Sequence, residues 1–211
     1  MSIVGKPERW VSHFLSIHEL ILGAIERAWE RCRTRCTPRT KEDHITRRLV
    51  VLIKQDPFVR AAPYCPIISQ YELLPKEAEG DVSPKGYIDI AVLFRPDEDE
   101  LYLAYECKRL NVGGQRRRHS LASEYVRQGM MRFVKAQYAQ GLPLGAMLGY
   151  VMDGDVSFAA SSVKGQIQSR SAELFCGTPL WQDIKVPTAF TTEHHRPSYP
   201  IVLRHHLLSV S

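Results

Sequence analysis

The chain has 211 residues, of which 44% are hydrophobic, so it holds enough apolar material for one substantial domain and is not a disordered chain. Its formal net charge of +5 is compatible with a polyanionic partner such as nucleic acid but does not by itself indicate one. The five cysteines are odd in number and lack the spacing of a disulfide framework or a zinc site, which favours free thiols in a reducing compartment.

Membrane insertion and secretion are not expected. No stretch approaches the ~20 consecutive apolar residues of a membrane-spanning helix. The N-terminal sequence MSIVGKPERW lacks the continuous apolar core of a signal peptide. We therefore expect a soluble, cytoplasmic protein with no membrane partner.

The first part of the chain predicts two amphipathic helices. Residues 8–34 carry apolar side chains at helical spacing, and residues 1–39 are interpreted as a helical extension of a main domain over residues 40–211. A second helix is expected from Thr40, a candidate N-cap, to about residue 55, where the sequence DPF and later prolines end it.

From residue 67 the apolar pattern changes to a period of two, which predicts strands. Strands are expected in IISQYELLP, GYIDIAVLFRP and ELYLAYECKRL. The last two are joined by the short polar link PDEDE, so they should form an antiparallel hairpin.

The second half of the chain continues with alternating helices and strands. A helix capped by Ser120 or Ser123 is expected to end at Gly141, followed by a buried strand in LPLGAMLGYVMDG. A further helix over residues 155–170 and a final strand in SYPIVLRHHLLSV complete the pattern. The order of elements predicts an α/β fold with a mixed central β-sheet flanked by helices.

Charged side chains gather near the end of the third predicted strand. Because side chains alternate along a strand, Glu106 and Lys108 share one face, while Tyr105 and Cys107 take the other. Asp89, an acid among apolar residues of the preceding strand, lies toward the same end of the hairpin. Two acids and a lysine should therefore converge where the hairpin is open.

The second predicted helix contributes a further acid, Glu42, at the start of its apolar stripe, where a charge needs a partner, a metal ion or a catalytic role. Converging carboxylates repel one another, and Mg²⁺, or Mn²⁺ in its place, relieves that repulsion. Asp89 and Glu106 are the expected ligands, with Glu42 as a direct or outer ligand. Lys108 would orient or deprotonate an attacking water, or neutralise charge on a phosphoryl transition state.

This set of residues, on a helix and two paired strands, resembles the PD-(D/E)XK nuclease superfamily, which has the restriction-endonuclease-like fold. The residues that carry the resemblance are Glu42, Asp89, Glu106, Cys107 and Lys108. The resemblance covers about residues 40–152, and it departs from the motif at Ile88, where the motif has proline. It implies a restriction-endonuclease-like core, in which a helix and a further strand follow the (D/E)-X-K strand.

The same resemblance implies an Mg²⁺-dependent deoxyribonuclease, endonucleolytic or exonucleolytic, that acts on DNA in preference to RNA. It implies that the backbone carbonyl of Cys107 joins the metal ligands and that a polar residue of the next helix, here Gln128, joins the catalytic site. Its products would carry 5′-phosphate and 3′-hydroxyl ends. By analogy, the protein would serve prokaryotic restriction, antiviral (phage) defence or repair, as a homodimer or as a subunit of a defence complex.

Alternatives stay open at this stage. The loop with Arg116, Arg117 and Arg118 would either bind the phosphate backbone of DNA or be an ordinary solvated loop. The acids would be structural in a metal-independent binding protein, with Asp89 satisfied by backbone donors and the Glu-X-Lys pair solvated. A nuclease fold that no longer cuts would instead bind nucleic acid or help to assemble a larger defence complex.

The histidine pairs of the C-terminal region are expected to be ordinary core or surface residues. Neighbouring residues of a strand point to opposite faces, so the pair His194 and His195, like His205 and His206, supplies at most one ligand to any point. No carboxylate or cysteine is spaced to complete a zinc site with them.

Overall fold

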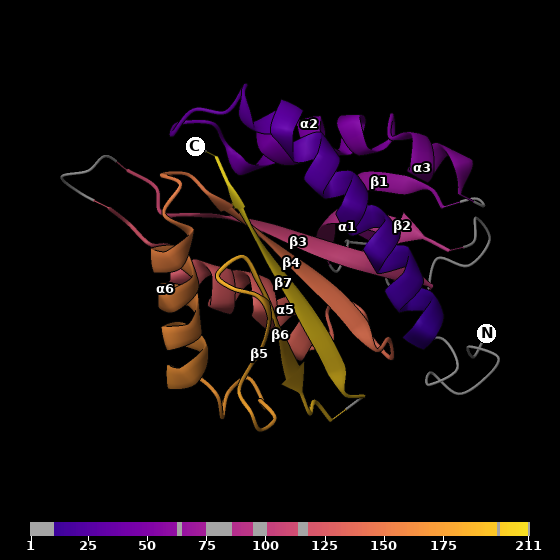
Figure 1. Cartoon of the computed structure of the whole chain (residues 1–211). Helices are drawn as coiled ribbons and strands as arrows, with labels where there is room; N and C mark the ends of the chain where they lie inside the picture. The colour runs from indigo at the N-terminus through magenta and orange to yellow at the C-terminus, as the bar shows by residue number, and fades with distance from the viewer. Residues whose placement is uncertain are drawn as a thin grey trace.

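The computed structural model describes residues 11–62, 65–74, 86–94, 101–113, 118–197 and 199–210. Within these ranges, seven strands form one mixed sheet in the order β1-β2-β3-β4-β7-β6-β5, and helices cover both faces (Figure 1). The predicted α/β class, a mixed central sheet flanked by helices, is therefore confirmed.

The first helices of the described chain are α1 (Val11–Arg33), α2 (Glu42–Ile53) and α3 (Pro57–Ala61). The first two agree with the predicted helices, whereas the short α3 is not predicted by the apolar pattern. Its N-cap, Asp56, accepts hydrogen bonds from the backbone N–H groups of Phe58 and Val59, and it also pairs with Arg27 of α1 at 2.7 Å. None of the described helices is both long and apolar enough to cross a membrane.

Three antiparallel strands follow: β1 (Ile67–Leu73), β2 (Gly86–Leu93) and β3 (Tyr102–Leu110). β2 pairs with β1 on one side and with β3 on the other, where the pairing runs from Leu93↔Tyr102 to Ile90↔Tyr105. The predicted hairpin is therefore confirmed.

The helix predicted after β3 is divided into α4 (Ala122–Glu124), a π-helical turn η2 (Tyr125–Met130) and α5 (Met131–Val134). It ends before Gly141, the predicted end. The next elements, β4 (Leu144–Val151) and α6 (Val156–Ser169), agree with the predicted strand and helix. β4 lies parallel to β3, as expected when a helical segment connects two strands of one sheet.

The C-terminal part contains β5 (Gln182–Lys185), β6 (Ala189–His194) and β7 (Ile201–Ser209). β7 is the predicted final strand, and it lies in the interior of the sheet, parallel to β4 and antiparallel to β6. The sequence pattern does not predict β5 or β6. β6 carries buried polar residues, Thr192 and His194, which interrupt the apolar alternation of a strand.

Two predicted helix caps are wrong. Lys41, not Thr40, is the N-cap of α2, and it makes no side-chain capping hydrogen bond. The N-cap of α4 is Leu121, which has a left-handed backbone (φ 53°), and neither Ser120 nor Ser123 takes that place.

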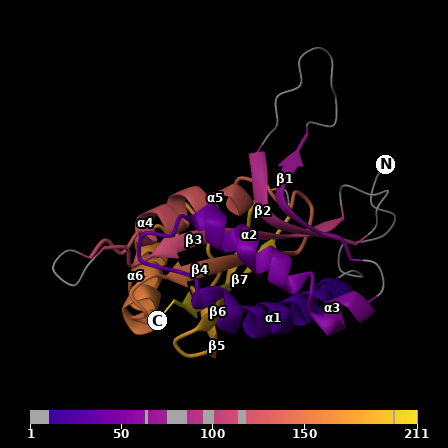
Figure 2. The ribbon, with the colours of Figure 1, turned by 90° about the horizontal axis from the view of Figure 1, so that it is seen from above.

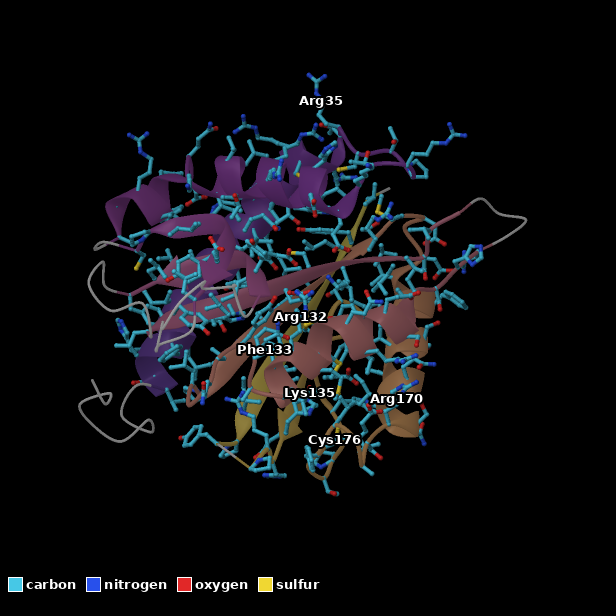
Figure 3. The ribbon with its side chains drawn as sticks, turned by 180° about the vertical axis from the view of Figure 1, so that it is seen from behind. Arg35, Arg132, Phe133, Lys135, Arg170 and Cys176 are labelled. Atoms are coloured by element: carbon cyan, nitrogen blue, oxygen red, sulfur yellow. The ribbon has the colours of Figure 1, made fainter. Side chains whose placement is uncertain are left out.

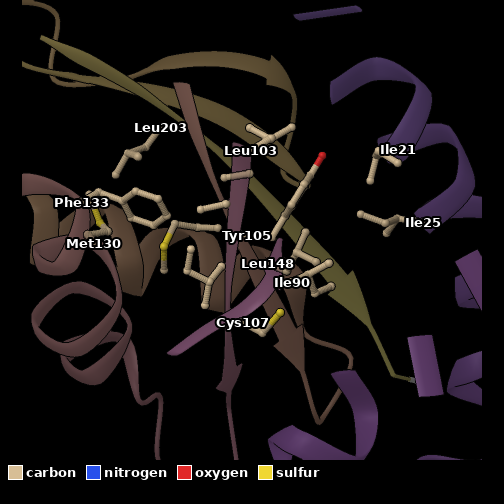
Figure 4. Packing of buried hydrophobic residues seen from close by; sticks show 14 of the residues in the cluster. Ile21, Ile25, Ile90, Leu103, Tyr105, Cys107, Met130, Phe133, Leu148 and Leu203 are labelled. Carbon is tan, nitrogen blue, oxygen red and sulfur yellow. The ribbon is translucent and has the colours of Figure 1, made fainter. Parts of the chain in front are cut away.

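The core lies on both faces of the sheet. Figure 2 shows α1, α2 and α3 on one face and α4, α5 and α6 on the other. Tyr105 and Cys107 of β3 are fully buried and point to the α1 side, while Met130 and Phe133 lie on the opposite side (Figure 4). The five cysteines are free thiols, as expected.

α1 packs directly on the sheet. The indole Nε1 of Trp29 donates to the backbone carbonyl of Ser209 in β7 at 2.7 Å, and its ring stacks on that of Tyr150 in β4 at 5.5 Å. Apolar residues of α1 belong to the same core cluster as those of the sheet. The boundary at residue 39 stays a prediction.

Four buried histidines line the sheet: His18, His194, His205 and His206. The Thr192 hydroxyl bridges two of them, at 2.7 Å from His194 Nε2 and 2.9 Å from His205 Nε2. The Tyr125 hydroxyl lies 3.0 Å from His205 Nδ1. His195, by contrast, is exposed, and that these histidines bind no metal stays a prediction.

These histidines make stability depend on pH. Burial lowers the pKa of His18 to about 2 and the pKa values of His194 and His206 to about 4, from 6.5. The unfolded chain therefore binds more protons below about pH 6.5, and folding stability is lost as the pH falls from there toward 4. We expect the free energy of unfolding in urea to fall by ~1 kcal/mol per buried histidine between about pH 6.5 and 5.5.

A matched pair of variants tests whether the buried histidines cause this pH dependence of stability. His206→Gln should reduce the pH dependence, whereas His195→Ala, which removes an exposed ring, should leave it unchanged. Equal stability of the wild-type protein at about pH 7.5 and 5.5 would contradict the prediction.

Candidate active site

The candidate site lies where β2 and β3 separate. Their pairing ends at Ile90↔Tyr105, while β2 extends back to Gly86 along β1 and β3 extends on to Leu110 along β4. Beyond Tyr105, none of the described strands pairs with this edge of β3. Its backbone groups therefore need side-chain partners.

Two of the predicted acids supply those partners. Asp89 Oδ2 accepts a hydrogen bond from the backbone N–H of Cys107 at 2.7 Å, and Glu42 Oε2 accepts one from the backbone N–H of Arg109 at 2.8 Å. Glu42 is the first residue of α2 and reaches β3 from the start of that helix. The edge of β3 thus gathers carboxylates from a helix and from a neighbouring strand.

Lys108 lies among oxygen atoms of this edge. Its Nζ is 2.7 Å from Glu106 Oε1, 3.0 Å from Glu42 Oε1 and 2.8 Å from the carbonyl oxygen of Cys107. Burial alone would lower the pKa of Lys108, but the surrounding carboxylates, Glu106 first among them, outweigh it and raise that pKa above its usual value. Lys108 is therefore a cation at neutral pH.

Glu106 is fully buried, at 0% exposure, and it shares a strand face with Lys108 as predicted. Burial and the neighbouring charge of Asp89 raise the pKa of Glu106 to about 7, although Lys108 and Arg132 lower it. The alternative of a solvated Glu–Lys pair is therefore wrong. Glu106 and Lys108 belong to a buried charge network.

Arg132 of α5 is a second cation on Glu106, and the sequence analysis does not predict it. Its Nη1 is 3.1 Å from Glu106 Oε1, 3.2 Å from Oε2 and 2.5 Å from the Tyr138 hydroxyl. Tyr138 in turn donates to the carbonyl of Tyr87, on the side of β2 that has separated from β3. Figure 3 shows Arg132 on the side of its helix nearest the strands. Arg132 and Tyr138 thus bridge the gap between β2 and β3.

Gln70 of β1 is the other residue that sequence reasoning missed. Its Nε2 donates to Asp89 Oδ1 at 3.0 Å. The backbone of Gln70 is left-handed (φ 54°), which interrupts the β1–β2 pairing at this residue. Such a conformation costs a non-glycine residue ~1–2 kcal/mol, and strain of this kind clusters at functional sites. In the sequence, only the polar side chain of Gln70 indicates that this residue contacts Asp89.

In the helical segment formed by α4, η2 and α5, the residues that face Glu106 do not include Gln128, the predicted one. Gly129 and Arg132 face Glu106: a Cβ placed on Gly129 would lie 3.5 Å from Glu106 Cγ and 2.5 Å from Met147 Cε. Gln128 is exposed on η2. Its catalytic role stays a prediction.

The arginine-rich loop is anchored at the end that the structure describes. Arg118 pairs with Asp153 at 2.7 Å and with Asp155 at 3.1 Å, which holds the loop to the start of α6. Arg116 and Arg117 lie outside the described residues. Contact of this loop with DNA stays a prediction.

The oxygen donors at the site are of the kind that hard divalent cations prefer. They are the carboxylates of Asp89 and Glu106 and the carbonyl of Cys107. Within the described ranges, no group of three or more His, Cys, Asp or Glu side chains is placed to hold a metal ion. The positive charge beside Glu106 comes from Lys108 and Arg132.

Comparisons with protein-family models, with curated proteins and with solved structures gave no significant match. Function is therefore inferred from the side chains that meet at this site.

The left-handed conformation of Gln70 predicts an unusual order of stability. Gln70→Gly and Gln70→Ala both lose the hydrogen bond to Asp89, but only glycine adopts this φ without a steric cost. We expect the glycine variant to be more stable by ~1 kcal/mol, the reverse of the usual order in a strand, as measured by urea denaturation. At the neighbouring Ser69, the alanine variant should be at least as stable as the glycine variant. Equal stability of the two Gln70 variants would contradict the prediction.

The charged form of Glu106 costs stability. Its pKa in the folded protein is about 7, above the ordinary value of 4.5, so its favourable contribution is present below pH 4.5 and is lost as the pH rises through 7. Glu106→Gln should therefore raise the free energy of unfolding by ~1–3 kcal/mol at about pH 8 and change it little near pH 4.5. Asp43→Asn, which removes an exposed carboxylate of α2, is the control. A destabilised Glu106→Gln at about pH 8 would contradict the prediction.

Proposed function

We propose that this protein is a metal-dependent nuclease that hydrolyses phosphodiester bonds of DNA. The observation that carries the proposal is the carboxylate of Glu106, which is fully buried beside Asp89 and 2.7 Å from Lys108 Nζ. A buried acid with a strongly raised pKa costs stability when it is charged. Such groups cluster at sites of binding and catalysis.

The order of the elements supports the proposal. Glu42 lies on α2, Asp89 on β2 and the Glu106–Lys108 pair on β3, and a helical segment then leads to β4, parallel to β3. This is the order that the resemblance to the PD-(D/E)XK superfamily implies for a restriction-endonuclease-like core. The set of side chains required by that resemblance meets at one end of β3.

Asp89, Glu106 and the carbonyl of Cys107 are the groups that would hold Mg²⁺ or Mn²⁺. Such an ion, when bound, polarises phosphoryl oxygens and lowers the pKa of its water. Glu42 fits an outer position better than a direct one, because one of its oxygens accepts from Lys108 and the other from the backbone of Arg109.

Lys108 acts as a fixed positive charge in this proposal. Because its pKa is raised, it holds its proton at neutral pH and does not serve as the base for water. Glu42 and the Cys107 carbonyl fix its amine, which then orients the attacking water and stabilises negative charge on the phosphoryl oxygens. The water oxygen bonds to phosphorus as the bond to the 3′-oxygen breaks. The proton that the water loses goes to solvent and the 3′-oxygen takes one from solvent, which leaves 5′-phosphate and 3′-hydroxyl ends.

A purely structural explanation accounts for part of the network only. Asp89 and Glu42 satisfy backbone donors of β3, a task that needs no more than an acceptor oxygen. Among its contacts with described residues, Glu106 meets the cations Lys108 and Arg132 and no backbone donor. Its burial therefore favours a catalytic role. By analogy with other small nucleases, we place that role in prokaryotic restriction, phage defence or repair.

The proposal predicts cation-dependent cleavage. The purified protein should cut plasmid or linear DNA with Mg²⁺ or Mn²⁺ and not with EDTA. Glu106→Ala and Lys108→Ala should each lower the cleavage rate by ~100-fold or more, because each removes a charge that acts on the transition state. Gel assays of initial rates at equal protein concentration measure the effect.

Lys135→Ala is the matched control, since it removes an exposed lysine just after α5. It should cut at the wild-type rate. Equal rates for Lys108→Ala and wild type would refute the site assignment. A wild-type protein that binds DNA but cuts it with neither cation would support the catalytically silent alternative.

A further inference from the structure

Arg132 lies between the buried charges and solvent. Its side chain is 36% exposed, whereas that of Lys108 is 12% exposed. The guanidinium contacts both carboxylate oxygens of Glu106 on one side and lies over the ring of Tyr138, 5.4 Å from its centroid. It is thus the more accessible of the two cations that neutralise Glu106.

The guanidinium of Arg132 is only partly used by the protein. Its hydrogen bonds and ion pair with described residues all run through Nη1. A guanidinium has five N–H donors in a planar fork that matches the oxygens of a phosphate group. The Nη2 and Nε edge of Arg132 therefore keeps donors for an anion that arrives from solvent.

Arg132 and a divalent cation compete for the same carboxylate. A cation held by Glu106 would repel a guanidinium that lies 3.1 Å from the same oxygen. Lys108 is kept in place by Glu42 and by the Cys107 carbonyl, in addition to Glu106. Apart from Glu106, Arg132 has one hydrogen-bond partner among the described residues, Tyr138, and its side chain is the more exposed of the two cations. It is therefore the cation with fewer contacts to give up.

We propose that Arg132 is a phosphate-binding residue whose guanidinium stays paired with Glu106 until a divalent cation is bound. In the absence of a divalent cation the guanidinium neutralises Glu106, and once a cation takes that carboxylate the guanidinium turns to the phosphodiester backbone beside the cleaved bond. This inference rests on the proposed nuclease function and deepens it. It couples binding of the cation to binding of the substrate through one side chain.

The first measurement is binding of Mn²⁺ alone, by titration calorimetry, to the full chain without DNA. Arg132→Ala and Arg132→Gln should bind Mn²⁺ more tightly than wild type, by roughly 3- to 10-fold, because a competing positive charge is gone. Arg132→Lys keeps the charge and should stay near wild type. Lys135→Ala, at the residue labelled beyond Arg132 in Figure 3, removes an exposed charge and should change nothing.

The second measurement is binding of a short DNA duplex by fluorescence anisotropy, with Mn²⁺ or with EDTA. Lys108→Met serves as the background for every protein compared, so that the duplex stays intact. Adding Arg132→Gln should weaken DNA binding by roughly 3- to 10-fold with Mn²⁺ and have little effect with EDTA. Circular dichroism checks that each variant folds, and Arg132→Lys should restore part of the lost affinity.

The outcomes separate this inference from the function on which it rests. A wild-type protein that neither binds Mn²⁺ nor cuts DNA overturns both. A protein that binds Mn²⁺ and cuts DNA, but whose Arg132→Gln variant has unchanged affinity for Mn²⁺, overturns the role of Arg132 alone. Equal weakening of DNA binding with Mn²⁺ and with EDTA also overturns it, because the arginine would then contact DNA without any exchange.

Discussion

The candidate site depends on one constraint: β3 extends beyond the end of its pairing with β2, and the backbone donors of that free edge must still be satisfied. Carboxylates from β2 and from the start of α2 accept those hydrogen bonds. On the separated edge of β2, the backbone carbonyl of Tyr87 accepts a hydrogen bond from the hydroxyl of Tyr138. A gap between two strands is thus lined with charged and polar groups that distant parts of the chain supply, and the strand that carries Glu106 and Lys108 runs through it.

Two features of this gap cost stability, and both are next to Asp89. Gln70 has a left-handed backbone, and Glu106 is a buried acid with a raised pKa. A polar residue on a strand does not need a strained backbone to make a hydrogen bond, and a core does not need a carboxylate. The apolar packing on both faces of the sheet offsets these costs, which are typical of sites arranged for binding or reaction.

Alternation along β3 predicted the shared face of Glu106 and Lys108, and the apolar stripe of α2 predicted that Glu42 faces the sheet. These inferences succeed because they need only the period of a strand or helix. Arg132 was not predictable in this way, because the π-helical turn before it has more residues than an α turn and shifts those that follow around the helix axis. The backbone of Gln70 leaves no sequence signature. β6 escaped prediction because its buried Thr192 and His194 satisfy each other, so the strand does not need the usual apolar alternation.

The place of β7 in the sheet has a consequence for how the molecule is made. The residues that meet at the gap, of which Tyr138 is the last, precede β4 in the chain. β4 supports β3 and has β7 (Ile201–Ser209) as its other neighbour. A ribosome-bound chain that has not yet produced this strand leaves β4 as an open edge. The sheet that surrounds the charged gap is therefore complete only after β7 has been synthesised, so a partly made chain lacks the framework that holds these charged groups together.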